Sequence, residues 1–181
     1  MLDDDMLETS DLSSFDAIVS GVRAYNTRDR LKNVNRRLLD YVERGGTLVV
    51  QYNVASSALA DRIGPYPLTI GRDRVTVESA PVTFPVPDHP LLNFPNKITS
   101  ADFEGWVQER GLYFASSWDE KYTAILSSHD PGEPDQKGGL LYARYGKGVF
   151  IYTGYAWFRE LPAGVPGAFR IFANLVSTGK R

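Results

Sequence analysis

"FDAIVSGVRAYNTRDRLKNVNRRLLDYVERGGTLVVQYN", residues 15–53, is the stretch that decides the fold. Short apolar runs at 15–22 and 47–50 flank a segment whose apolar residues recur three and four positions apart. The flanking runs predict strands, and the spacing predicts an amphipathic helix that ends at Gly45 and Gly46. Its inward positions are Leu31, Val34, Leu38, Tyr41 and Val42. A strand, a helix and a strand in so short a segment predict a βαβ unit with parallel strands.

The middle of the chain predicts short extended pieces. Residues 64–96 contain seven prolines, which exclude a helix and suit edge strands and turns, with extended pieces at 67–71 and 74–84. In "TSADFEGW" (99–106), Thr99 and Asp102 have the spacing of a capping box at the start of a helical turn. The stretches 111–116 and 122–129 are strand-like.

The C-terminal third predicts a hairpin followed by a helix. "GGLLYARYGKGVFIYTGY" (138–155) has the pattern of two strands, with Gly146 and Gly148 available for positive φ in the turn. The final helix begins near Pro166 and ends at Gly179. Its predicted inward residues are Ala168, Phe169, Phe172, Leu175 and Val176.

Length and composition favour one α/β domain over 1–181, with residues 1–14 as a loop-like lead-in. A doubly wound domain would place a further βα unit before residue 15, so we expect that this unit is missing from the chain. The net charge of -2 argues against nucleic acid or a membrane surface as partner, and the apolar runs are too short to span a bilayer. The acidic N-terminus lacks the pattern of a signal peptide, and the compartment stays open.

Several segments resemble, in order, the class I glutamine amidotransferase-like domain that follows the catalytic domain of large bacterial PIG-L (LmbE-like) deacetylases. These are "FDAIVSGVRAYNTRDRL", "GGTLVVQYN", "IGPYPLTIGRDRVT", "DFEGWVQERGLYF" and "YGKGVFIYTGYAWFRELPAGVPGAFRIFANL". The resemblance runs from about residue 12 to the end, and it implies a flavodoxin-like three-layer sandwich with a mostly parallel central sheet.

The same resemblance implies that the chain is not catalytic. In active amidotransferases the strand that corresponds to "TLVVQYN" ends in a turn with a nucleophilic cysteine, but this sequence has no cysteine. Gln51, Tyr52 and Asn53 stand there instead, and none is a nucleophile at neutral pH, since a tyrosine has a pKa of about 10. Glu160 is the acid that remains near the expected histidine and glutamate pair. The chain also lacks the "AHPDD"-type zinc motif of the deacetylase domain, so we expect no catalytic residue, metal or cofactor.

The leading candidate site is the rim formed by the carboxyl ends of the parallel strands, where ligands collect in open α/β sheets. Its eight candidate ligand-binding residues are Arg23, Tyr25 and Asn26 after the first strand, Gln51, Tyr52 and Asn53 after the second, and Arg159 and Glu160 after the last. Their guanidinium, phenol and amide groups suit hydroxyl-rich or carboxylate ligands. In the alternative interpretation, the Asn and Tyr side chains cap strand ends and bond the loop backbone.

Three other clusters are weaker candidates. His129, Asp130 and Glu133 in "HDPGE" are potential metal ligands, but Pro and Gly favour a turn there. Asp102, Glu104 and Glu109 would need to face each other across a cleft to act as glycosidase carboxylates. "FRELPAGVPGAFR" (158–170) leads into a helix N-terminus that could bind an anion, and the aromatic residues before it could form an interface. These residues are Tyr152, Tyr155, Trp157 and Phe158.

The sequence therefore favours a non-catalytic accessory domain of a PIG-L/LmbE-like deacetylase system. Its expected partner is a deacetylase domain or subunit, or a carbohydrate-like ligand bound at the rim. Two alternatives stay open: a hydrolase that acts on sugar derivatives through carboxylates, and a homo-oligomeric assembly module, as similar domains are in some β-galactosidases.

Overall fold

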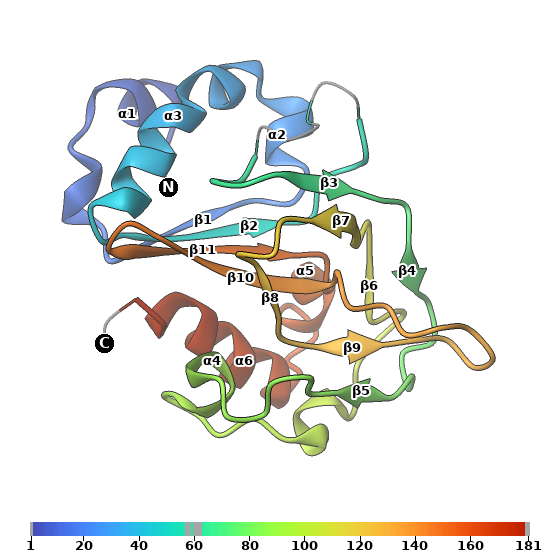
Figure 1. Cartoon of the computed structure of the whole chain (residues 1–181). Coiled ribbons are helices and arrows are strands. Elements are labelled where there is room, and N and C mark those ends of the chain that lie inside the picture. The colour runs from blue at the N-terminus through green and yellow to red at the C-terminus, as the bar shows by residue number, and fades with distance from the viewer. Residues whose placement is uncertain (1, 57–58, 60–62, 180–181) are drawn as a thin grey trace.

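The computed structural model describes residues 2–56, 59 and 63–179 and has a five-stranded mixed sheet at its centre (Figure 1). The strands lie in the order β1 (Ala17–Ser20), β2 (Thr47–Gln51), β11 (Gly148–Thr153), β10 (Leu140–Tyr145) and β8 (Thr123–Ala124). β1, β2 and β11 are parallel, whereas β10 runs antiparallel to both β11 and β8. The βαβ unit and the hairpin predicted from the sequence are confirmed.

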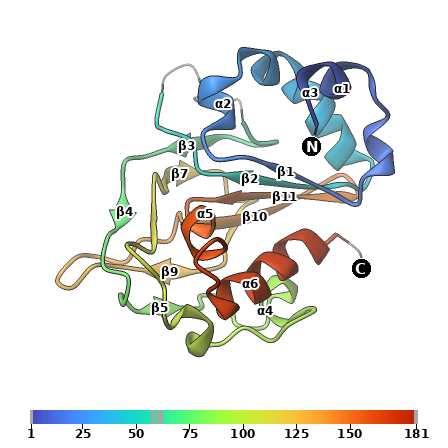
Figure 2. The ribbon, with the colours of Figure 1, turned by 180° about the vertical axis from the view of Figure 1, so that it is seen from behind.

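Helices cover both faces of this sheet (Figures 1 and 2). One face carries α1 (Asp4–Thr9), α2 (Ala24–Thr27) and α3 (Asp29–Glu43), and the other carries α4 (Pro90–Asn93) and α6 (Pro166–Ser177). α5 (Trp157–Glu160) lies at the end of the sheet where β11 stops. None of the helices in the described part of the chain is long and apolar enough to cross a membrane.

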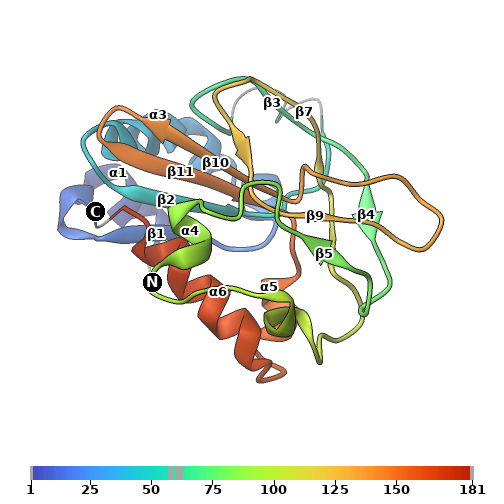
Figure 3. The same cartoon turned by 60° about the horizontal axis from the view of Figure 1, so that its bottom comes forward.

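Three two-stranded ladders and two short 3₁₀ helices complete the described part of the chain. The ladders are β3 (Leu68–Ile70) with β7 (Ala115–Trp118), β4 (Arg74–Val75) with β6 (Gly111–Leu112), and β5 (Val82–Thr83) with β9 (Ser127–Ser128). The 3₁₀ helices are η1 (Leu12–Ser14) and η3 (Ser100–Phe103). Figure 3 shows α4 beside α6 and the short strands gathered at one end of the molecule. The proline-rich segment thus forms short extended pieces, as predicted, but the expectation that its prolines exclude a helix was wrong: α4 lies within it. The single turn of α4 begins at Pro90, and a proline is tolerated in the first turn of a helix because its missing N–H would have no partner there.

The sheet separates two hydrophobic cores because its side chains alternate between its faces. Leu48 and Val50 of β2 join the core beneath α3, whereas Val49 joins the core that contacts α6. β11 alternates in the same way, with Phe150 in the first core and Ile151 in the second. Every predicted inward residue of α3 is buried in the first core.

The final helix begins and ends as predicted, but its predicted inward face was wrong in part. Phe169 is 52% exposed, whereas Ile171 and Asn174 are buried. Phe172 and Val176 are half-buried, and Ala168 and Leu175 lie in the core as expected. The buried face is thus rotated toward Ile171 and Asn174.

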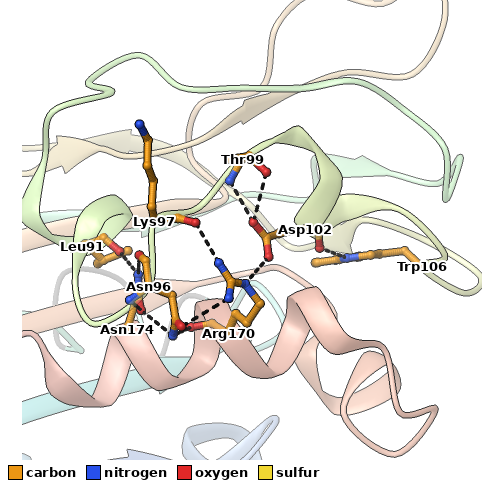
Figure 4. Close-up of polar contacts among 8 residues, drawn as sticks. All are labelled: Leu91, Asn96, Lys97, Thr99, Asp102, Trp106, Arg170 and Asn174. Carbon is orange, nitrogen blue, oxygen red and sulfur yellow. Dashed lines mark hydrogen bonds and ion pairs between the residues drawn. The ribbon is translucent and has the colours of Figure 1, made fainter.

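Asn174 explains this rotation, because it joins α6 to the loop after α4 (Figure 4). Its Oδ1 accepts from the backbone N of Asn96 at 2.9 Å, and its Nδ2 donates to the backbone O of Leu91 and of Asn96 at 2.8 Å each. In the same view, Asp102 accepts from the backbone N of Thr99, which confirms the capping box, and from Arg170 Nε at 2.7 Å. Polar residues on α6 therefore position the segment from 91 to 102.

Two other details differ from expectation. The lead-in is not a loop: α1 forms, with Asp3 as N-cap and Leu7 buried. In the hairpin turn, Gly146 has φ of 57°, whereas Gly148 does not have a positive φ.

Candidate functional site

The strands β1, β2 and β11 all end at one edge of the sheet, beside α2 and α5 (Figure 1). We call this edge, with the segment 107–113 that packs against it, the strand-end rim. All eight candidate residues come from segments that meet here. The structure divides them into residues with internal partners and residues that face outward.

Asn53 and Tyr25 belong to the interior. Asn53 is fully buried, its Oδ1 accepts from the backbone N of Tyr25 at 3.0 Å, and its Nδ2 donates to the backbone O of Gln51 at 3.0 Å. Tyr25 is 1% exposed and donates its hydroxyl to Asn35 Oδ1 at 2.6 Å. The Asn53 amide thus joins the segments that follow β1 and β2, and the Tyr25 hydroxyl joins α2 to α3.

Asn26 and Gln51 also bond the backbone. Asn26 donates Nδ2 to Val54 O at 3.0 Å and accepts from Val54 N at 2.8 Å. Gln51 donates Nε2 to the backbone O of Ser20 at 3.2 Å. The amides at this edge therefore act as the loop ties of the alternative interpretation.

Tyr52 faces outward and lies between two other aromatic rings. Its ring is nearly parallel to that of Tyr113, with 5.7 Å between centroids, and tilted against that of Phe158 at 5.2 Å. All three residues are half-buried. Burial raises the pKa of the Tyr52 hydroxyl, while Arg23 and Arg159 act in the opposite direction, so this group is a neutral donor at physiological pH.

Charged residues border this aromatic cluster. Arg159 donates Nε to Glu109 Oε1 at 2.8 Å, and its guanidinium lies 4.9 Å from the centre of the Phe158 ring. Arg23 is exposed. The outward part of the rim thus offers three rings, two guanidinium groups and one carboxylate.

Backbone strain is concentrated around the rim. Three non-glycine residues in the described ranges have positive φ: Arg23 at 56°, Gln108 at 67° and Tyr113 at 55°. Such a backbone costs about 1–3 kcal/mol at each residue and is found most often at functional sites. The left-handed turn occurs after β1, at Arg23, and none of the residues from 51 to 53 has a positive φ.

Glu160 lies beneath the rim. Its side chain is 0% exposed, Oε2 accepts from the backbone N of Val107 at 3.0 Å, and Oε1 has no partner among the described residues. Burial raises the pKa of this carboxyl group, although the bond from Val107 opposes the change. Direct contact with a ligand on the surface is therefore excluded for Glu160 in this conformation.

The other candidate clusters have structural partners. The Asp130 carboxylate accepts from the backbone N of Thr76 and of Val77 and from the Thr76 hydroxyl, at 2.7 to 3.0 Å. Burial would raise the pKa of Asp130, but these hydrogen bonds keep it below its ordinary value. Within the described ranges, no group of three His, Asp or Glu residues is arranged to hold a metal ion.

The three candidate carboxylates lie in different surroundings. Asp102 pairs with Arg170, Glu109 pairs with Arg159, and Glu104 is exposed. Of the aromatic residues proposed for an interface, Tyr152, Tyr155 and Trp157 are buried, and only Phe158 reaches the surface.

Sequence reasoning missed Tyr113. It belongs to a strand-like stretch in which nothing distinguishes it from a core residue, and its left-handed backbone brings its ring to Tyr52. The pairing could not be read from a local pattern because the two residues are far apart in the chain.

No protein-family model matches the sequence, and no curated protein matches it either. Cytoplasmic protein STM3548 from Salmonella typhimurium superposes with a TM-score of 0.58 and 16% identity, over 92% of this chain and 72% of that one. Cytoplasmic protein STM1381 from Salmonella typhimurium LT2 superposes with a TM-score of 0.57 and 15% identity, over 97% of this chain and 78% of that one. A β-galactosidase from Bacillus circulans sp. alkalophilus superposes with a TM-score of 0.52 and 14% identity, over 95% of this chain and 24% of the enzyme. At such low identities the similarity shows a shared fold and nothing about function.

Proposed function

We propose that the chain is a non-catalytic, amidotransferase-like accessory domain of a PIG-L/LmbE-like deacetylase system, with a flavodoxin-like three-layer arrangement. In this proposal, the strand-end rim binds a carbohydrate-like ligand. The observation that carries it is the half-exposed cluster of Tyr52, Tyr113 and Phe158, bordered by Arg23 and the Arg159–Glu109 ion pair.

The chemistry of the cluster suits a sugar. Aromatic rings pack against the apolar face of a pyranose, while guanidinium and carboxylate groups exchange hydrogen bonds with its hydroxyls. The strain at Arg23 and Tyr113 is consistent with a site whose geometry is set in advance. The rim lacks the cysteine nucleophile of active amidotransferases, since the chain has no cysteine, and the amides of Gln51 and Asn53 bond the backbone.

A titration with N-acetylglucosamine tetramer, followed by protein NMR, tests this function. We expect shifts at residues around Tyr52 and at least tenfold weaker binding by Tyr52→Ala, because the central ring of the cluster is lost. Phe169→Ala, which removes an exposed ring on α6, is the matched control and should bind as the native chain does.

The same samples test the absence of catalysis. Neither hydrolysis of the tetramer nor glutaminase activity should be detectable. Turnover that disappears on substitution of Tyr52 or Asn53 would overturn the proposal, and so would binding that Tyr52→Ala leaves unchanged.

Assembly of several copies of the chain is the second candidate function, and the outermost strand of the sheet, β1, favours it. In the described part of the chain no strand pairs with the outer side of β1, and Val19 on that strand is 37% exposed. Parallel strands are ordinarily covered, and an uncovered edge can pair with another chain. Light scattering that detects only monomer at micromolar concentration would count against this function.

A further inference from the structure

A second site surrounds the buried side chain of Arg110, in a cavity that none of the eight candidate residues of the strand-end rim lines. The backbone of Arg110 belongs to the rim segment 107–113, but its side chain lines this other cavity. This residue is only 4% exposed, and its guanidinium lies 5.3 Å from the centre of the Trp106 ring and 5.7 Å from that of Phe103. It lines a cavity of about 430 Å³ whose other walls are formed by residues 78–82, Ser100 and residues 103–106. The fold therefore holds a buried guanidinium group in a fixed position in the wall of a cavity.

The hydrogen bonds of Arg110 are incomplete. Nε donates to Ala80 O at 2.9 Å and Nη1 donates to Phe103 O at 2.5 Å, so both protein partners are neutral carbonyl groups. Nη2 has no acceptor among the described residues. It is not among the unbonded atoms that are completely shielded from solvent, so it is partly accessible. Because Arg110 lines the cavity and its Nε and Nη1 are bonded to the protein, Nη2 is the donor that remains for a molecule inside it.

Arg110 also lacks a contacting counter-ion. No carboxylate in the described ranges lies within 4 Å of its guanidinium. Burial lowers the pKa of Arg110, and the acidic groups of Tyr155, Glu160 and Glu78 act in the opposite direction. Burial also raises the pKa of Tyr155, so that its hydroxyl is neutral and is not a counter-ion. A buried cation without a paired anion is unfavourable, and a ligand carboxylate would correct this.

The remaining charges of the cavity narrow the choice of ligand. Glu78 and Glu104 line the same cavity and are exposed, so they repel a purely anionic ligand. They attract a cationic group placed on the same molecule. The walls therefore complement a small molecule that carries both charges.

We propose that this cavity binds a small zwitterion, with its carboxylate on Arg110 Nη2 and its ammonium group toward Glu78 and Glu104. The ligand class is that of amino acids and amino-acid-like compounds. Trp106 and Phe103 supply apolar wall beside the guanidinium and confine the ligand's hydrocarbon part.

A series of probes with increasing charge separation tests the site: glycine, β-alanine, γ-aminobutyrate and 6-aminohexanoate. Acetate and methylammonium each carry one of the two charges and are the reference compounds. With backbone and arginine side-chain NMR signals as the readout, we expect one zwitterion to bind at least tenfold more tightly than either reference. The shifts should be centred on residues 78–82 and 100–110.

Substitutions test separately how the protein binds the ammonium group and the carboxylate group of the ligand. Glu78→Gln should remove at least fivefold of the advantage of the zwitterion over acetate without weakening acetate binding. The matched control is Glu120→Gln, an exposed residue in the turn between β7 and β8, which should change neither value. Arg110→Lys should weaken all carboxylates, and a folded NMR spectrum must accompany that result. Glu78→Gln keeps the test decisive if Arg110→Lys does not fold.

Three outcomes would overturn the proposal: no probe binds at 20 mM, the shifts lie outside the cavity, or Glu78→Gln leaves the preference for zwitterions unchanged. Tyr52→Ala should have no effect on these probes. Failure of this site is thereby distinguished from failure of the rim.

Discussion

At the scale of single residues, Asn174 is the side chain whose loss should destabilise the fold most specifically. It is fully buried and makes hydrogen bonds to Leu91 and Asn96 that no other side chain on α6 replaces in the described structure. Asn174→Ala leaves those backbone groups without partners, so we expect a loss of about 2–4 kcal/mol in the free energy of unfolding. Urea unfolding measures this value.

The matched control is Phe169→Ala on the same helix. Because Phe169 is 52% exposed, its truncation should change stability by less than about 0.5 kcal/mol. Equal effects of the two substitutions would contradict the observed rotation of α6.

Glu160 should make stability depend on pH. Burial raises the pKa of its carboxyl group above the ordinary value of 4.5 in the folded state, so the folded chain holds this proton more tightly than the unfolded chain. The stabilisation that this proton gives is complete below the pKa that Glu160 has in the unfolded chain. It is lost as pH rises through the pKa of Glu160 in the folded chain. Relative to Glu160→Gln, which does not titrate, the native chain should therefore lose stability from pH 4 upward and then reach a plateau.

Urea unfolding of both proteins at steps between pH 4 and pH 8 provides the measurement. Other titrating groups cancel in the difference between them. A difference that is constant, or that changes with the opposite sign, would show that the carboxyl group is ionised in the folded state without penalty.

The rim illustrates what a sequence can predict at this scale. The convergence of residues 23–26 and 51–53 follows from parallel strands, and it was predicted. The burial of Asn53 was not predicted, because it depends on a hydrogen bond from the backbone N of Tyr25, which lies 28 residues earlier in the chain. Local patterns give the type of a residue, whereas its hydrogen-bond partner depends on the finished fold.

At the scale of elements, the turn between β10 and β11 should tolerate substitution poorly. A Cβ on Gly146 would lie 2.3 Å from Glu43 O at the end of α3, and its φ is 57°. Gly132 also has a positive φ, of 83°, but has open space around it. Both Ala variants incur the left-handed backbone cost of about 1–2 kcal/mol, and only Gly146→Ala adds a clash.

We therefore expect Gly146→Ala to lower the unfolding free energy by about 1–3 kcal/mol more than Gly132→Ala does. Thermal or urea unfolding of the two variants gives the difference. If the variants were equally stable, the hairpin would not need this close approach to α3.

Helices were predictable where their apolar pattern was long. α3 covers 15 residues and shows its buried face in the spacing of its apolar side chains. α1 has six residues and one buried side chain, too few for a period, and it is supported by ion pairs of Asp5 and Glu8 with Arg30. The buried face of α6 was predicted wrongly in part because Asn174 lies on its inner face and Phe169 on its outer face.

At the scale of the whole molecule, the sheet should make the two cores unfold together. Neighbouring residues of β2 and β11 enter opposite cores, so neither core can lose its packing without affecting strands that the other needs. Leu38 lies in the core beneath α3, and Leu175 lies in the core that contacts α6. Each Leu→Ala substitution should lower the unfolding free energy by about 2–5 kcal/mol.

The decisive measurement compares two probes of unfolding for Leu38→Ala. Trp106 and Trp157 lie in the opposite core from Leu38, whereas Trp118 packs against the core of Leu38. In a Trp118→Phe background, tryptophan fluorescence therefore reports on the undamaged side, while far-UV circular dichroism reports on the whole chain. We expect both transitions to move by the same amount and to coincide, as a two-state transition requires. A fluorescence transition that stays at its native midpoint would show that the core around α6 is stable without the core around α3, against the shared role of β2 and β11.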